Sequence, residues 1–310
     1  MPRKCLVLYH PRARGLQDDG LRERTRELHE QLGPGLELRR GDDPDLDEHL
    51  RTLDPERDAI VVLGGDGTLH HAIRRVASVL GEESPWPRFG FLPAGTANDG
   101  ARSIEQLRGE PSTLASIAAS LRADRIAKSA DLGRVVCPAT GFRRFFVSFA
   151  GLGGACDWVR IADSRWFAPV KRLGAAIAYP LCSLAVILRA RRTDLSVSID
   201  DAPRDGARLF TLFVAKGRYL GGGLDLGSDV RLDSGRLAVV AIRAGSRTAI
   251  LRQFLAAQRG GASDSIAARR VRLRIPSPAA INLDGELVRF DAPHEVEVEI
   301  DVAPGRIRWA

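Results

Sequence analysis

The sequence predicts an α/β plus β fold of two domains, an amino-terminal parallel-sheet domain followed by a carboxy-terminal β-sandwich-like domain. The chain has 310 residues, about twice the usual length of a single domain. Its first part alternates short apolar runs with amphipathic stretches, as parallel sheets covered by helices do. From about Leu132 onward, apolar and polar residues alternate with period two, which is typical of half-exposed antiparallel strands.

The first domain is assigned to residues 1–130. Four short apolar runs predict its strands: Cys5–Tyr9, Leu36–Leu38, Ala59–Leu63 and Phe89–Leu92. Three amphipathic stretches predict its helices: Leu21–Leu32, Leu46–Leu53 and Thr68–Leu80. Gly81 stands where a helix C-cap is expected, which supports the end of the third helix.

The second domain is assigned to residues 131–310, with its last strand as a candidate to return to the first domain. The period-two alternation is clearest in three segments: Leu195–Ile199, Val271–Ile275 and Val296–Val302. Two helical stretches interrupt this region: Leu173–Leu188 and Thr248–Gln258. No internal repeat and no low-complexity tract occurs.

The stretch Leu173–Leu188 carries no charge, as a membrane-spanning segment would. It has only sixteen residues and contains Gly174 and Pro180, whereas a bilayer crossing needs roughly 20 apolar residues. Leucine and isoleucine recur within it at helical spacing, at positions 173, 177, 181, 184 and 188. This periodicity favours a core helix, with an interfacial helix as the alternative.

Composition and charge narrow the class of protein. Hydrophobic residues at 44% and charged residues at 27% exclude a disordered or fibrous chain. The 46 basic residues outnumber the 39 acidic ones, which favours anionic partners such as phosphate esters, nucleic acid or an acidic membrane face. The four cysteines lie far apart and form no C-x-x-C pair, and the amino terminus has no secretory signal pattern. We therefore expect a cytoplasmic protein.

The most informative motif is Gly64-Gly-Asp-Gly-Thr68, which lies between a buried strand and a helix. Glycines around Asp66 allow the backbone N–H groups to approach a ligand, and the helix that follows presents its positive end. We interpret this as a phosphate-binding loop. Its central carboxylate would repel a bare phosphate, so it suggests a metal-bound nucleotide or a hydroxyl that needs an acceptor.

A second glycine turn, Gly90–Asp99, also ends a predicted strand. In an open parallel sheet both turns would lie at the carboxyl ends of strands, where such folds bind ligands. The chain contains no P-loop motif, and Gly151–Cys156 lacks the third glycine of a dinucleotide fingerprint. Neither a Gly-x-Ser-x-Gly elbow nor a His-Glu-x-x-His pair occurs. P-loop NTPases, ordinary dehydrogenases and the common serine and zinc hydrolases are therefore disfavoured.

Several motifs then stand in one order along the chain. They are Gly64–Thr68, Leu92–Asp99, Asp131–Gly133, Gly221–Gly223, Leu232–Gly235 and Asn282–Glu286. Over nearly the whole chain this set resembles the diacylglycerol kinase catalytic domain family of lipid kinases, especially its small soluble bacterial members, which are related to sphingosine kinases and NAD kinases. A Gly-Gly-Asp-Gly loop alone also occurs in NAD kinases and phosphofructokinases, whereas the full set through Asp-Gly-Glu points to lipid kinases.

The resemblance implies an ATP-dependent lipid kinase, a phosphotransferase that moves the γ-phosphoryl group to a hydroxyl of a diacylglycerol-like or other lipid. Its cofactors would be ATP and Mg²⁺. The implied nucleotide-binding residues are Gly64, Gly65, Asp66, Gly67, Thr68, Leu69, His70 and Thr96. The implied catalytic residues are Asp66, Asp284 and Glu286, the last two jointly as base and metal-network partners, with Glu286 as the preferred base. For Asp284-Gly285-Glu286 the alternative is an exposed hairpin turn.

The chain departs from the family pattern at three places. His70-His71 replaces Asn-Glu after the nucleotide loop, and we expect two helix-surface histidines because adjacent side chains point about 100° apart. His10 replaces the Asn of an amino-terminal Asn-Pro. Ser234 replaces the second acid of Leu-Asp-Asp-Gly, a position that helps to hold a structural magnesium in some members, which leaves Asp233 as the candidate metal ligand.

Two features suit a membrane surface as partner, with the protein peripheral on the inner membrane face. One is the apolar stretch Leu173–Leu188, flanked by Lys171-Arg172 and by Arg189, Arg191 and Arg192; the other is the basic strand Arg269–Arg274. Two other functions stay open: an NAD kinase-like kinase of a soluble acceptor, and a catalytically silent lipid- or nucleotide-binding protein. Nucleic acid is not expected as a partner, because the arginines are spread along the chain without a recognition motif. The oligomeric state stays open.

Overall fold

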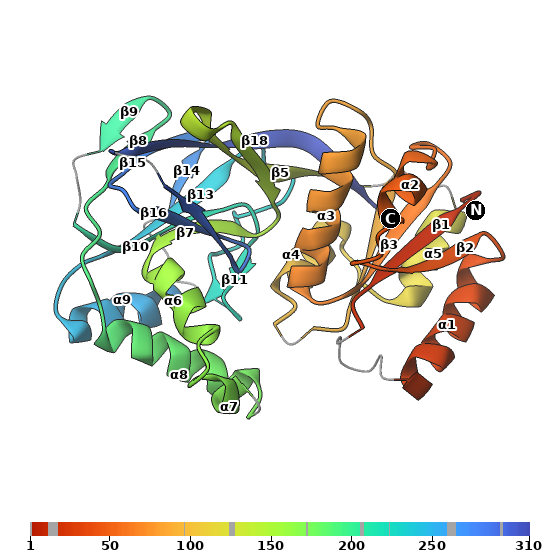
Figure 1. Cartoon of the computed structure of the whole chain (residues 1–310), viewed down its shortest axis with the longest axis horizontal. Coiled ribbons are helices and arrows are strands. Elements are labelled where there is room, and N and C mark those ends of the chain that lie inside the picture. The colour runs from red at the N-terminus through yellow and green to blue at the C-terminus, as the bar shows by residue number, and fades with distance from the viewer. Residues whose placement is uncertain are drawn as a thin grey trace. The chain divides into compact units, whose positions relative to one another are not determined.

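The structure is a computed structural model that describes residues 2–11, 18–95, 97–123, 128–171, 173–204, 208–222, 224–258, 265–291 and 294–310. Its internal contacts divide the chain into two compact units. Unit 1 comprises Met1–Asp131 and Pro304–Ala310, and unit 2 comprises Leu132–Ala303. Figure 1 shows a sheet with helices in unit 1 and many strands in unit 2.

Unit 1 is built on a parallel sheet in the order β2-β1-β3-β4. These strands are β1 (Cys5–Tyr9), β2 (Leu36–Arg40), β3 (Ala59–Gly64) and β4 (Arg88–Pro93). The last strand of the chain, β18 (Val296–Trp309), reaches β4 at its end, where Trp309 pairs with Phe89. All four strands predicted for this part of the chain are present, and they are parallel as predicted.

Five helices are described in unit 1: α1 (Asp18–Leu32), α2 (Leu46–Arg51), α3 (Asp66–Leu80), α4 (Asp99–Arg108) and α5 (Leu114–Arg122). Leu28 of α1 and Ile117 of α5 pack in one core cluster with Val7 and Val61. The alternate strand residues Leu6, Leu8, Ile60 and Val62 are also buried, so both faces of the sheet are covered. The sequence predicted α1, α2 and α3 but missed α4 and α5.

Unit 2 is a sandwich of two antiparallel sheets. The first contains the body of β18, β15 (Arg270–Ile275), β8 (Ser196–Ile199) and β9 (Ala202–Arg204), and β5 (Lys128–Cys137) pairs with β18 and with β6 (Phe142–Phe146). The second has the order β14 (Ile266–Ala268), β13 (Leu237–Arg243), β10 (Leu209–Ala215), β7 (Phe149–Gly153), β16 (Ala279–Leu283) and β17 (Glu286–Phe290). Shorter elements are the 3₁₀ turn Pro138–Thr140, β11 (Tyr219–Leu220) and β12 (Leu224–Asp225).

The core of unit 2 lies between its two sheets. Val271 and Leu273 of β15 face Val214 of β10 and Ile281 of β16 in one buried cluster. The segments with period-two alternation form β8, β15 and β18, and their apolar residues are buried except for Val302, which is partly buried. The predicted α/β plus β-sandwich fold is confirmed.

Helices cover the outer face of the second sheet, where α6 (Gly154–Ala162), α7 (Ala168–Lys171), α8 (Ala175–Leu188) and α9 (Arg247–Gln258) lie together (Figure 1). Ala178, Cys182, Val186 and Ile187 of α8 are buried in this layer. No helix in the described part of the chain is both long and apolar enough to cross a bilayer.

The prediction of a core helix is wrong for the leucine and isoleucine stripe on which it was based. Those side chains are all exposed, by 43% to 61%: Leu173, Ile177, Leu181, Leu184 and Leu188. The helix is apolar on both sides, and its buried face consists of Ala178, Cys182, Val186 and Ile187 instead. Periodicity identified the stripe but not the side that faces the core.

All four cysteines are buried and free. Burial raises the pKa of the Cys5 and Cys156 thiols to about 12. A raised pKa keeps the thiol protonated and therefore unreactive at about pH 8. We expect iodoacetamide at this pH to leave the native protein unmodified, and to label all four cysteines in urea. Mass spectrometry of the intact chain would measure this, and rapid labelling of Cys5 or Cys156 in the native protein would contradict the burial.

Candidate active site

The glycine motif lies where β3 ends and α3 begins, as predicted. A Cβ on Gly64 would meet the Thr68 side chain at 2.4 Å, so packing requires a glycine there. A Cβ on Gly65 would meet the Cα of Gly95 at 3.1 Å, which is a tight contact. Gly67 is different, since it is exposed and a Cβ there would meet nothing within 4 Å. The surface beside Gly67 is therefore open to a ligand.

The second glycine turn lies directly against the first. The Ala94 N–H donates to the Gly64 carbonyl at 2.7 Å, and the Gly95 N–H donates to Asn98 Oδ1 at 3.1 Å. Asn98 has a left-handed backbone, with φ of 54°, and precedes α4. The structure thus brings together the two turns that the sequence placed at neighbouring strand ends, while Thr96 lies outside the described residues.

The Asp66 carboxylate joins α3 to α4. Its Oδ2 accepts a hydrogen bond from the Asp99 N–H at 3.1 Å, and its Oδ1 accepts one from the Gly100 N–H at 2.9 Å. These N–H groups belong to the first turn of α4, where an anionic acceptor stabilises the helix start. Asp66 thus has a structural role in addition to its position in the candidate phosphate loop.

The two residues after Thr68 that were assigned to nucleotide binding are buried: Leu69 is 1% and His70 is 4% exposed. The expectation of two helix-surface histidines is therefore wrong for His70. His71 is partly buried, with Nε2 3.2 Å from the Gly41 carbonyl, and burial lowers its pKa. The backbone of this first helical turn, rather than the Leu69 and His70 side chains, lies beside the exposed part of the loop.

In unit 2, Asp284 and Gly285 form the two-residue turn between β16 and β17, with φ of 49° and 92°. Positive φ at both positions is the type I′ geometry, for which Asp-Gly is favoured. The hairpin turn weighed from the sequence is therefore present. The Asp284 carboxylate, however, is held by hydrogen bonds from another segment.

The Asp284 carboxylate accepts three backbone hydrogen bonds. The N–H of Val147 donates to Oδ2 at 2.7 Å, and those of Ser148 and Phe149 donate to Oδ1 at 2.9 and 2.8 Å. The Asp284 N–H in turn donates to the Phe149 carbonyl at 3.1 Å. Asp284 thus fixes the hairpin to the segment that leads into β7.

Asn282, which is 3% exposed, supports the same turn. Its Oδ1 accepts from the Gly285 N–H at 2.8 Å, and its Nδ2 donates to the Ala155 carbonyl at 3.0 Å. The sequence placed Asn282 inside the closing motif without a role for it. The signal that could have identified it is an asparagine two residues before an Asp-Gly pair, because an amide that becomes buried there needs hydrogen-bond partners.

Glu286 is the accessible carboxylate of the pair, with 45% of its side chain exposed. Its Oε1 lies 3.1 Å from Nη1 of Arg144, whose guanidinium carbon is 5.2 Å from the Phe142 ring centroid. Sequence reasoning missed Arg144, although a pair of arginines within the apolar strand β6 marks the position. The turn thus separates two acids that are close in sequence, with Asp284 hydrogen-bonded to the backbone of another segment and Glu286 exposed.

Asp233, the candidate metal ligand, is engaged by Arg231. Its two carboxylate oxygens accept from Nε and Nη2 of that guanidinium at 2.9 and 2.8 Å, and this pairing lowers the pKa of Asp233. Among the described residues no group of three or more His, Cys, Asp or Glu side chains could hold a metal ion. With Ser234 at the second acidic position, these residues do not fit the structural magnesium that the resemblance implies.

Comparisons with known proteins agree with this arrangement. Residues 4–135 match the diacylglycerol kinase catalytic domain, and residues 162–309 match the YegS C-terminal NAD kinase beta sandwich-like domain. The chain is 29% identical over 284 residues to the "Probable lipid kinase YegS-like" of Stenotrophomonas maltophilia, covering 89% of this chain and 86% of that protein. It is 25% identical over 236 residues to the diacylglycerol kinase of Bacillus subtilis, covering 74% and 72%.

The fold is also similar to a solved structure. A diacylglycerol kinase from Bacillus anthracis str. Sterne has a TM-score of 0.72 and 21% identity, covering 99% of this chain and 96% of that one. This likeness agrees with the two-part fold described above.

The different surroundings of the two acids predict different effects on stability. Asp284→Asn replaces one acceptor oxygen by an amine that faces backbone N–H donors, so we expect the free energy of unfolding to fall by about 1–3 kcal/mol. Glu286→Gln changes a half-exposed side chain and should alter it by less than about 0.5 kcal/mol. Urea unfolding of both variants would measure this, and equal stability of the two would contradict the assigned roles.

Proposed function

The chain belongs to the diacylglycerol kinase catalytic domain family, and from this premise we propose that it is an ATP-dependent kinase that phosphorylates the hydroxyl of a diacylglycerol-like lipid. The observation that carries the proposal is the Asp284–Glu286 turn, which holds one carboxylate in place and presents the other. Phosphoryl transfer to an alcohol needs a positioned acceptor for the hydroxyl proton.

Unit 1 would bind the nucleotide at Gly64–Thr68. The open surface beside Gly67 admits phosphate oxygens close to the backbone, and the start of α3 favours negative charge. Mg²⁺ bound with the nucleotide would neutralise the charge that develops on the transferred group. Asp66, half-buried in the same loop, is the carboxylate that would contact that ion or its water.

In unit 2, Glu286 would accept the proton of the lipid hydroxyl. Its exposure gives a substrate access to the carboxylate, and Arg144 orients that carboxylate through the ion pair. Asp284 acts on Glu286 indirectly, because its three backbone hydrogen bonds fix the turn from which β17 begins. Asp284 is therefore a positioning residue, and Glu286 is the proposed base.

A membrane surface is the proposed location of the lipid acceptor, and the exposed side of α8 is the proposed contact. Leu181, Leu184 and Leu188 of the exposed stripe lie on a helix that also contacts α9, whose Leu251 and Leu255 are 38% and 39% exposed. Trp166 is 53% exposed, and the guanidinium of Arg189 lies over its ring. Exposed apolar side chains clustered on one face of a unit mark a surface that contacts apolar material.

The charges around this face favour binding to an anionic bilayer. Residues 164–193 contain six basic residues and no acidic one: Arg165, Lys171, Arg172, Arg189, Arg191 and Arg192. Basic groups beside an embedded apolar face attract anionic headgroups, by roughly 1 kcal/mol each. We therefore propose peripheral association with the inner membrane face.

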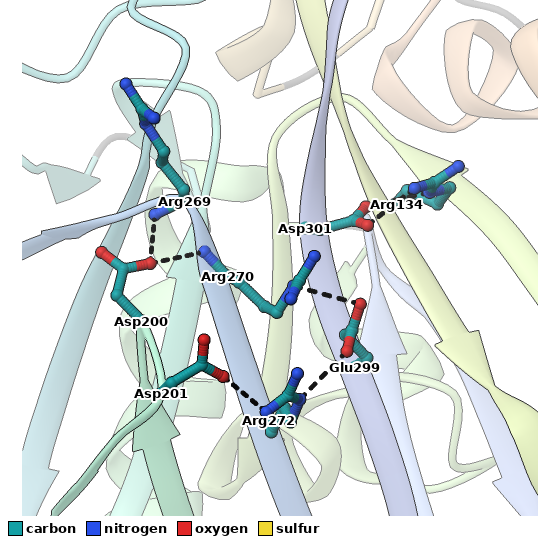
Figure 2. Close-up of polar contacts among 8 residues, drawn as sticks. All are labelled: Arg134, Asp200, Asp201, Arg269, Arg270, Arg272, Glu299 and Asp301. Carbon is teal, nitrogen blue, oxygen red and sulfur yellow. Dashed lines mark hydrogen bonds and ion pairs between the residues drawn. The ribbon is translucent and has the colours of Figure 1, made fainter.

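The basic strand β15 is not part of the proposed contact, because its arginines are paired with acids. Arg270 pairs with Glu299 at 3.3 Å, and Arg272 pairs with both Glu299 and Asp201 (Figure 2). Arg274 pairs with Glu297 at 3.4 Å. These cross-strand pairs neutralise the strand locally and stabilise the sheet, as opposite charges on neighbouring strands do.

The kinase proposal predicts transfer of label from γ-labelled ATP to diacylglycerol in mixed micelles with Mg²⁺, and none to NAD. Glu286→Gln should lower the rate by at least about 10²-fold, because general base catalysis contributes roughly that much. The matched control is Glu295→Gln, an exposed glutamate of the same unit, which should keep the parent rate. Label in NAD but not in lipid would favour the soluble-acceptor function. Full activity of Glu286→Gln would exclude Glu286 as the base.

The docking proposal predicts flotation of the protein with phosphatidylglycerol-containing vesicles and much weaker flotation with pure phosphatidylcholine. The double variant Leu181→Ser plus Leu184→Ser should weaken vesicle binding by at least about tenfold, through loss of buried apolar area. Arg189→Glu plus Arg191→Glu should remove the preference for anionic vesicles.

Two exposed residues away from α8 provide matched controls. Ile266→Ser on β14 and Arg269→Glu beside β15 should leave vesicle binding unchanged. Equal loss in the controls and in the α8 variants would contradict the assigned face. A concentration-dependent dimer in sedimentation that disappears with the leucine variants would instead identify a second copy of the chain as the occupant.

A further inference from the structure

Lys216, directly after β10, is the cation buried deepest among the described residues of unit 2. Its side chain is 0% exposed. Its ammonium Nζ donates to the carbonyl oxygens of Arg231 and Arg236 at 2.9 and 3.0 Å, and to Oγ of Ser234 at 3.2 Å. These three acceptors come from one turn, the segment Arg231–Arg236 that precedes β13.

The oxygens of this turn converge as the ligands of a hard cation do. Backbone carbonyls and short oxygen-bearing side chains are the usual donors to such ions in proteins. An ammonium group has three N–H donors and no acceptor, so three convergent oxygens match it as well. Ser234 Oγ also lies 2.9 Å from the Arg231 carbonyl and 3.2 Å from that of Arg236, which draws the acceptors together.

We infer that the Lys216 ammonium takes the place of the structural magnesium that the family pattern implies for this turn. Ser234 stands at the position of the acidic residue, and its hydroxyl faces Lys216. A divalent cation with one carboxylate, and an ammonium with one hydroxyl, leave the same single positive charge beside the carbonyls. The loss of the acid and the presence of the lysine therefore compensate each other.

The same lysine links the turn to the candidate active site. Its backbone N–H and that of Gly217 donate to the Ser148 carbonyl at 2.8 and 3.0 Å. Ser148 belongs to the segment whose N–H groups hold the Asp284 carboxylate. An internal cation at this position thus stabilises the part of unit 2 that carries Glu286 and needs no metal to do so.

The test is thermal unfolding of the full chain without nucleotide, in EDTA and in Mg²⁺ or Ca²⁺. The parent protein should have the same Tm in all three conditions. Lys216→Met should lower the Tm by about 5 °C or more, because the carbonyls lose a charged donor, and metal should not restore it. Lys128→Met, at an exposed lysine, is the matched control and should leave the Tm unchanged.

The decisive variant removes the lysine and restores an acidic residue at position 234. Lys216→Ala plus Ser234→Asp should acquire a Tm that rises with Mg²⁺ or Ca²⁺ and falls in EDTA, and isothermal titration should detect the ion. A parent Tm that falls in EDTA and recovers with Mg²⁺ would overturn the inference, as would a folded double variant indifferent to both ions. Should the double variant not fold, the parent and Lys216→Met decide: a metal-sensitive parent or an unchanged Tm of Lys216→Met rejects the inference.

These outcomes are independent of the proposed function, because none uses ATP or a lipid. A protein without kinase activity can still show a Tm that depends on Lys216. Conversely, kinase activity would support the proposed function even if a metal-sensitive Tm rejected the lysine as the structural cation.

Discussion

The Asp284 carboxylate is the constraint on which the chemistry of unit 2 depends. It is held by three consecutive backbone N–H groups, from Val147 to Phe149, and the turn that it closes has a positive φ at both central residues. Hydrogen bonds to a charged acceptor are stronger than neutral ones, so this contact can maintain a turn geometry that is otherwise costly for a residue with a side chain. Glu286 begins the next strand, and its position follows from that geometry.

The sequence predicted the elements of the fold well where one local pattern decided them. Strands β8, β15 and β18 follow from period-two alternation, and α3 follows from its glycine entry and Gly81 exit. Helices α4 and α5 were missed because contacts outside their apolar pattern define their starts. An aspartate far earlier in the chain binds the first turn of α4, and a Thr113–Ser116 capping box begins α5.

The roles of the site residues could be predicted less completely. Sequence motifs singled out Asp284 and Glu286 as a pair. Only a contact across more than 130 positions distinguishes the acid that is held by backbone N–H groups from the exposed one. The orientation of α8 was not predictable for a related reason: both of its sides are apolar, so no local signal tells which one packs on the sheet. Both distinctions depend on tertiary contacts that no spacing rule contains.

The distribution of cations follows from the shape of the two basic side chains. The chain has 46 basic residues, of which only four are lysine, and the buried cation at the turn before β13 is one of those four. On the surface of β15 and β18, arginine is suited to the carboxylates of neighbouring strands because its planar guanidinium can bind two oxygens side by side, as Arg134 does with Asp301 (Figure 2). At Lys216 the acceptors are separate oxygens converging on one point, which the compact ammonium satisfies and a planar fork does not. The rare lysine therefore stands where the geometry of a small spherical ion is required.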